Sequence, residues 1–235
     1  MTAPTRPVSP TGFDDRRLVA PLLVLTAATG LVDAVSVLGL GRVFTANMTG
    51  NVVFLGFALA GTPGYSAARS LVALAAFLAG AALGGGLTNR TGGRIEPVLH
   101  RALFTESGLL AIGGAAALAL ASDAALQYGL IVITGVAMGL RNAAMRKLAV
   151  ADLTTTVLTL TLTGLGADSR LAGGASPRRI RRLGATAAML TGAAIGAVLV
   201  LRAGLGPALL LTGGITLLTA VACWRTTRAH SPSSG

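Results

Sequence analysis

Long runs of apolar residues dominate the chain, and six of them approach the length that a membrane-spanning helix needs. An α-helix rises about 1.5 Å per residue, so crossing the hydrocarbon takes roughly 20 predominantly apolar residues. The six runs cover residues 18–40, 70–88, 102–121, 124–139, 183–201 and 205–221. This pattern predicts an all-α membrane protein with about six transmembrane helices.

Two further apolar segments, residues 44–60 and 151–166, are shorter and begin with the polar clusters ANMTGN and ADLTTT. Whether they cross the membrane can be judged from the loops, because Lys and Arg accumulate on the cytoplasmic side. Eight crossings would place 11 of the 19 basic residues inside and 8 outside. If both short segments return to the side they entered from, 16 lie inside, Arg141 among them, and three outside: Arg42, Arg69 and Arg202. The asymmetry favours six spans plus two short broken or re-entrant helices, with both termini cytoplasmic.

The two halves of the chain, about residues 18–122 and 124–226, share a sequence repeat. AAFLAGAALGGG at residues 75–86 matches AAMLTGAAIGAV at residues 187–198. GLVDA from residue 30 matches GLRNA from residue 139, and ANMTGNV from residue 46 matches ADLTTTV from residue 151. Three matches in the same order predict pseudo-symmetric halves, which a six-span topology makes inverted. Inverted repeats with interrupted helices near the midplane are typical of secondary transporters.

Glycines spaced four residues apart occur at matching places in the two halves. They are Gly80 with Gly84, and Gly192 with Gly196. Small residues at this spacing let membrane helices approach closely, so these four are predicted to serve helix packing.

Polar side chains interrupt the apolar pattern at positions that correspond between the halves. Such residues in a membrane segment are costly, and a functional site is their first explanation. The candidates for binding a substrate or ion are Asp33, Asn47, Thr49 and Asn51 in the first half and Asn142, Asp152 and Thr154 in the second. The repeat aligns Asp33 with Asn142 and Asn47 with Asp152, so each half keeps one acid and one amide. The alternative is that these groups only cap helices or hydrogen-bond neighbouring helices.

Composition supports the membrane class and limits the chemistry. The chain of 235 residues is 53% hydrophobic and 11% charged, which is outside the range of soluble domains. Its net charge of +11 is explained by basic residues in the loops between apolar segments. Aromatic residues that could stack on bases make up only 4% of the chain, so no nucleic-acid partner is expected. Residues 1–17 and 227–235 are predicted to be disordered tails around one membrane domain, residues 18–226.

Few residues could support catalysis. Cys223 is the single cysteine, and His100 and His230 are far apart in the sequence, so we expect no enzyme, metal site or cofactor. Glu106 lies five residues after Arg101, which favours an ion pair between them at the membrane interface.

The blocks DAVSVLGLGRVFTANMTGNVVFLG and GLRNAAMRKLAVADLTTTVLTLTLTGLGAD, with the order of the spans around them, resemble the YoaK-like family of small bacterial inner-membrane proteins. The resemblance covers about residues 18–225, and its TGN block is the most specific part. It implies a multispanning protein of the bacterial cytoplasmic membrane, and no substrate or activity.

The leading expectation is a small-solute or ion transporter or channel. Asp33 and Asp152 would bind a proton, a cation or a polar solute, and the neighbouring amides and threonines would orient it. The alternative is a non-transporting membrane scaffold or assembly protein in which the polar residues only hold helices together. The expected partners are the lipid bilayer and an unknown small solute or ion, and a homo-oligomer stays open.

Overall fold

The computed structural model describes residues 15–91, 95–148, 158–169, 172–175 and 179–228, and these residues form helices and their connections without a strand. The helices in this described part are α1 (Asp15–Gly39), α2 (Met48–Leu59), α3 (Ala67–Arg90), α4 (Ile95–Ala119), α5 (Ala124–Leu148), α6 (Leu158–Ala167), α7 (Arg179–Ala203) and α8 (Leu205–Arg228). Six are long and apolar enough to cross a membrane, while α2 and α6 are shorter apolar helices. The predicted all-α class with about six spans is confirmed.

The connections follow from local backbone chemistry. After α1 the chain turns at Gly41 and Arg42, which both have positive φ values, 83° and 58°. This left-handed conformation ends a helix, and glycine adopts it without steric cost. Ser66 caps the start of α3, since its hydroxyl accepts a hydrogen bond from the Arg69 N–H at 3.4 Å.

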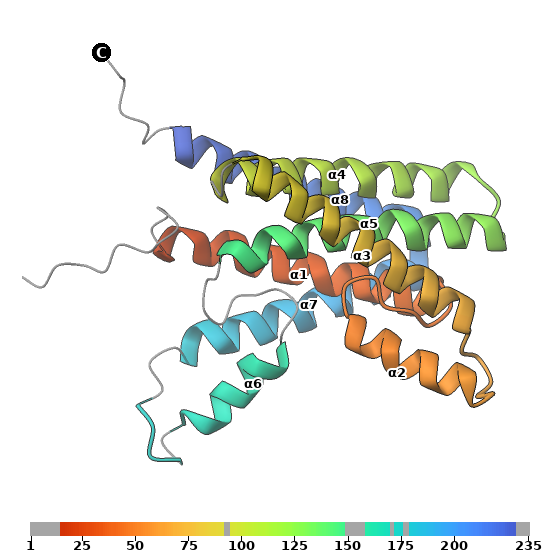
Figure 1. Ribbon diagram of the computed structural model, residues 1–235, viewed down its shortest axis with the longest axis horizontal. Coiled ribbons are helices and arrows are strands. Elements are labelled where there is room, and N and C mark those ends of the chain that lie inside the picture. The colour runs from red at the N-terminus through yellow and green to blue at the C-terminus, as the bar shows by residue number, and fades with distance from the viewer. Residues whose placement is uncertain (1–14, 92–94, 149–157, 170–171, 176–178, 229–235) are drawn as a thin grey trace, which may run out of the picture.

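The long helices pack mainly in three pairs: α1 with α7, α3 with α5, and α4 with α8 (Figure 1). In the first pair Gly192 faces Ala27 and Gly196 faces Leu31, so α1 and α7 run parallel. In the second pair Gly80 faces Val136 and Gly84 faces Leu140, so α3 and α5 also run parallel.

The third pair, α4 with α8, runs antiparallel and so bears on the number of spans. Ser107 donates to the carbonyl of Gly213 at 2.8 Å, whereas further along α4 Gly114 faces Gly206. If all eight helices crossed the membrane in turn, α4 and α8 would have the same direction. The antiparallel packing therefore agrees with six crossings.

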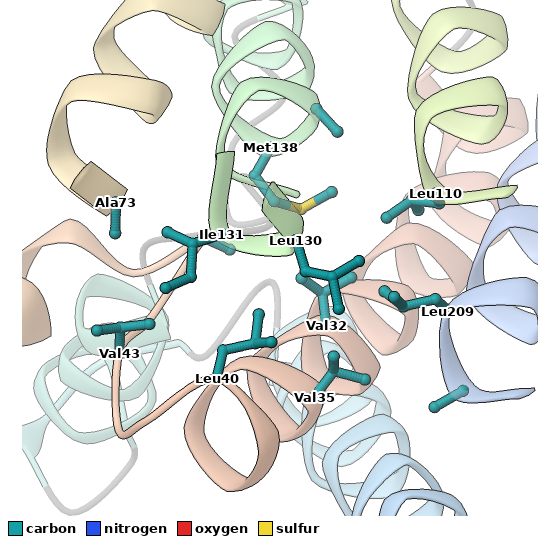
Figure 2. Packing of buried hydrophobic residues seen from close by; sticks show 13 residues of the cluster. Val32, Val35, Leu40, Val43, Ala73, Leu110, Leu130, Ile131, Met138 and Leu209 are labelled. Atoms are coloured by element: carbon teal, nitrogen blue, oxygen red, sulfur yellow. The ribbon is translucent and has the colours of Figure 1, made fainter. Parts of the chain in front are cut away.

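The largest buried apolar cluster of the described residues lies where α1, α3, α4, α5 and α8 meet the chain that leads into α2. Figure 2 shows ten labelled members: Val32, Val35, Leu40, Val43, Ala73, Leu110, Leu130, Ile131, Met138 and Leu209. Leu40, Val43, Thr45 and Ala46 are buried, so this connection packs into the core, although Arg42 and Asn47 are exposed. The core thereby fixes the position from which α2 begins.

The short helices α2 and α6 both begin near the middle of the molecule and run outward, α2 toward the start of α3 and α6 toward the start of α7 (Figure 1). α2 is held by rings at its side, where Phe54 contacts Tyr65 with centroids 5.0 Å apart. α6 is held to α7 by Arg182, which bonds the Gly164 carbonyl and the Asp168 carboxylate. With 12 and 10 residues, α2 and α6 are too short to cross the hydrocarbon as single helices.

Candidate functional site

A cavity of about 750 Å³ lies at the N-terminal ends of both short helices. Its walls come from α1, from the chain entering α2, from α2, from α6 and from α7. The lining residues are Thr29, Asp33, Phe44, Ala46, Asn47, Thr49, Gly50, Val53, Phe54, Leu158, Thr159, Leu160 and Met189. Residues that are far apart in the sequence, from both halves of the chain, therefore share one space, whose lining is mainly apolar with a few polar side chains.

Asp33 on α1 is the acidic residue among the described residues that line this cavity. Its side chain is 7% exposed, and the carboxylate accepts a hydrogen bond from the backbone N–H of Ala46. The other oxygen, Oδ1, has no hydrogen-bond partner. Buried polar atoms are nearly always paired, because an unpaired one loses its hydration without compensation. Asp33 thus lines the cavity and carries a buried carboxylate oxygen without a partner.

Asn47 and Thr49, two of the sequence-predicted site residues, also line the cavity. Asn47 is the N-cap of α2, and its side chain makes no capping hydrogen bond. The first turn of a helix carries free N–H groups and a partial positive charge, which favours negative or carbonyl oxygens. The cavity therefore combines a carboxylate with polar groups at a helix start.

Asn51, another predicted site residue, has a different environment. It is fully buried on α2; its Oδ1 accepts from the Phe44 N–H at 2.8 Å, and its Nδ2 donates to the Phe44 carbonyl at 2.5 Å. Both polar atoms of the amide therefore satisfy the backbone that precedes α2. Asn51 is not among the residues lining the cavity. Its position suits holding the re-entrant chain in shape.

Of the three candidate site residues in the second half of the chain, Asn142 alone lies within the described residues. Asn142 on α5 donates to the carbonyl of Met138 on its own helix at 2.8 Å and is not among the cavity-lining residues. Asp152 and Thr154 lie outside the described residues. Thr159 at the start of α6 does line the cavity.

A buried ion pair lies directly behind the cavity wall. Arg141 Nη1 lies 2.9 Å from Glu106 Oε1, and both side chains are completely buried. Arg141 also donates through Nη2 to the Thr29 hydroxyl at 2.6 Å, and Thr216 donates to Glu106 at 3.4 Å. The positive charge of Arg141 also acts electrostatically on the Asp33 carboxylate. We call Asp33, Glu106 and Arg141 the buried charge cluster.

Two sequence interpretations are wrong at this cluster. An apolar run that ends at residue 139 predicts a cytoplasmic Arg141, but α5 continues to Leu148 and Arg141 is buried within it. Glu106 does not form an interfacial pair with Arg101, which is exposed; it is buried against Arg141. A buried charge needs a partner of opposite sign, and α5 supplies it.

The ion pair had a signal in the sequence. Glu106 lies 13 residues before the end of α4 at Ala119, and Arg141 lies 17 residues after the start of α5 at Ala124. Consecutive spans joined by a short loop are antiparallel, so these two positions fall at about the same depth, within roughly one helical turn. Opposite charges at equal depth in neighbouring spans predict a pair.

The four predicted packing glycines lie at helix contacts. A Cβ at Gly192 would collide with the backbone of Ala27 on α1, and a Cβ at Gly80 would collide with the backbone of Val136 on α5. One turn further along the same contacts, a Cβ at Gly84 would lie 2.9 Å and a Cβ at Gly196 would lie 3.0 Å from the nearest backbone atom. These glycines set how closely the pairs α3/α5 and α1/α7 approach.

Six apolar spans, two short re-entrant helices and a charge cluster within the bundle define a polytopic helical membrane protein. Over residues 21–222 the chain matches the family described as "Protein of unknown function (DUF1275)", and it belongs to that family. It is 35% identical over 154 residues to the UPF0700 transmembrane protein YoaK of Bacillus subtilis (strain 168), across 65% of this chain and 67% of YoaK. The resemblance to the YoaK-like family is confirmed. No solved structure matches the chain significantly.

Proposed function

We propose that this protein moves a small polar solute or ion across the bilayer through the cavity between α2 and α6. The observation that carries the proposal is Asp33, a buried carboxylate with a free oxygen, in a space of about 750 Å³ at two helix starts. Non-helical backbone at membrane depth is tolerated where it is buried in protein or lines a water-filled cavity. Broken helices whose starts meet at a midplane site are the usual binding device of secondary transporters.

The proposal includes two inverted structural repeats, α1–α4 and α5–α8. Its support is the way close contacts recur: Gly30 packs on the backbone of Met189, and Gly139 packs on the backbone of Phe77. The repeat offsets, 109 residues for the glycines and 112 for their partners, are those of the sequence matches. The pairing of α1 with α7 is thus matched by the pairing of α5 with α3.

The proposed location is the bacterial cytoplasmic membrane, with both termini in the cytoplasm. The start of α1 and the end of α8 lie at the same end of the molecule (Figure 1). At the opposite end, Arg42 lies over the ring of Tyr65 at 5.7 Å and Arg69 over that of Tyr128 at 5.8 Å. Tyrosine and arginine in this arrangement suit a membrane–water interface.

The proposal is tested by flux into proteoliposomes that contain the purified full chain. A panel of protons, alkali ions and small neutral solutes is screened first, and the Asp33→Asn variant is then compared with the wild type on each transported species. We expect the variant to lose about tenfold or more of the flux, because a substitution at the free carboxylate removes the site's charge. Asp123→Asn is the matched control: Asp123 is exposed and caps α5 through the Leu126 N–H, which asparagine can also do.

Two outcomes would contradict the proposal. Equal flux through wild type and Asp33→Asn would remove Asp33 from the pathway. Wild-type flux no greater than that of empty vesicles, for every species in the panel, would favour the non-transporting scaffold instead.

A further inference from the structure

The buried charge cluster holds two acids and one base. Asp33 is 7% exposed, and Glu106 and Arg141 are 0% exposed, so none of the three is well hydrated. A single guanidinium can neutralise one carboxylate. The cluster therefore carries one negative charge in excess, in surroundings where an uncompensated charge is expensive.

The geometry shows which acid receives the neutralising charge. Arg141 forms its ion pair with Glu106 at 2.9 Å, and its second amino group donates a hydrogen bond to the Thr29 hydroxyl. Arg141 acts on Asp33 by electrostatic attraction alone. Asp33 Oδ1 and Glu106 Oε2 both lack hydrogen-bond partners, but of the two residues Asp33 is the one that lines the cavity. The excess charge is thus presented to the cavity at Asp33.

The start of α2 does not cancel this charge. A helix N-terminus carries about half of a positive unit charge, which is less than the one negative charge of the cluster. The backbone N–H of Ala46, which precedes α2, is donated to the Asp33 carboxylate. That hydrogen bond holds the acid in place and leaves its other oxygen free. An anion in the cavity would face this carboxylate directly.

We propose that the Glu106–Arg141 pair is a fixed internal counter-charge, and that it sets the cavity to accept one monovalent cation at Asp33, either a proton or an alkali ion. The inference rests on the proposed function and names its substrate class. A divalent cation would reverse the excess to one positive charge, and it would find a single carboxylate where Ca²⁺ needs about six to eight oxygen ligands.

The charge count predicts that a residue outside the cavity affects cation binding. Glu106→Gln leaves Arg141 to neutralise Asp33, so cation binding should fall about tenfold or more although Glu106 does not line the cavity. The double variant Glu106→Gln with Arg141→Gln leaves Asp33 as the one charge in the cluster. Binding should then return to within about threefold of the wild type.

Binding is measured on the full chain in detergent, as the rise in the thermal unfolding midpoint with NaCl or KCl, with N-methyl-D-glucamine chloride holding the ionic strength constant. A second arm uses proteoliposomes with an entrapped pH indicator and a potassium diffusion potential, which detects a proton as the ion. Asp33→Asn should abolish the response in whichever arm is positive, and Asp123→Asn should leave it unchanged.

The outcomes separate this inference from the proposed function. Alkali-ion binding without any flux would support the cation site and overturn transport. Flux of a neutral solute with no cation response in either arm would support transport and overturn the cation site. A double variant that responds as poorly as Glu106→Gln alone would also overturn the inference, because charge balance would then not explain the loss.

Discussion

At the scale of single residues, Arg141 connects three spans. It belongs to α5, pairs with Glu106 of α4 and donates to Thr29 of α1, and Thr216 of α8 extends the network through Glu106. Breaking a buried ion pair by removing one partner leaves a charge without hydration or compensation. The network is thus a structural link in which removal of one partner should be strongly destabilising.

Arg141→Met should therefore destabilise the protein by about 3–5 kcal/mol, because Glu106 is left buried and unpaired. Thermal unfolding in detergent measures the effect. Arg146→Met is the matched control, since Arg146 is exposed on the same helix. Equal unfolding midpoints for the two variants would contradict a stabilising role for the pair.

Asn51 gives a second prediction at the residue scale. Asn51→Leu keeps a similar volume but leaves the buried N–H and C=O of Phe44 without partners, at a cost of about 1–3 kcal/mol for each group. The unfolding midpoint should fall clearly below that of Asn89→Leu, a control at an exposed position on α3. A midpoint equal to the control's would show that the amide does not hold the chain that enters α2.

At the scale of elements, backbone contact through glycine joins the helices. α1 packs against α7 at Gly192, and α3 packs against α5 at Gly80, with no room for a side chain at either position. In lipid no hydrophobic force drives helices together, so van der Waals contact between close backbones contributes much of their association.

Gly80→Leu should accordingly separate α3 from α5 and destabilise the protein by about 1–3 kcal/mol or more, the usual cost of overpacking. Gly85→Leu is the control on the same helix, because a side chain at Gly85 would meet open space. The midpoint of thermal unfolding in detergent checks both. A loss as large for Gly85→Leu as for Gly80→Leu would argue against the close contact.

Sequence reasoning worked best where one physical term dominates. The spans follow from hydropathy alone, and Asp33, Asn47 and Thr49 stood out because polarity is rare in lipid; all three line the cavity. It failed at Arg141, where the end of a helix had to be known within a few residues. For Asn51 the sequence could not reveal that the amide is occupied by the Phe44 backbone, since that contact depends on the path of the chain.

At the scale of the whole molecule, the directions of the helices define how the chain is threaded through the bilayer. The pairs α1/α7 and α3/α5 are parallel and the pair α4/α8 is antiparallel, as required when α2 and α6 enter and return. The loop between α2 and α3 then lies on the side opposite to the end of α3.

This threading predicts which positions an impermeant thiol reagent reaches in intact cells. In a Cys223→Ser background, Thr62→Cys should be labelled from outside, and Asn89→Cys should be labelled only after the membrane is permeabilised. Both positions are exposed in the structure, so access depends on the side of the membrane. The reverse pattern would contradict this six-span threading with cytoplasmic termini.

The pairing of α1 with α7 also has a consequence for biogenesis. During synthesis α1 is made first, and about 150 further residues must be made before α7 can cover its glycine-contacting face. Arg141 arrives in between, on α5. Until then the nascent chain has neither partner, so its early spans depend on the insertion machinery to shield them, and a chain that terminates before α7 is a substrate for proteolysis.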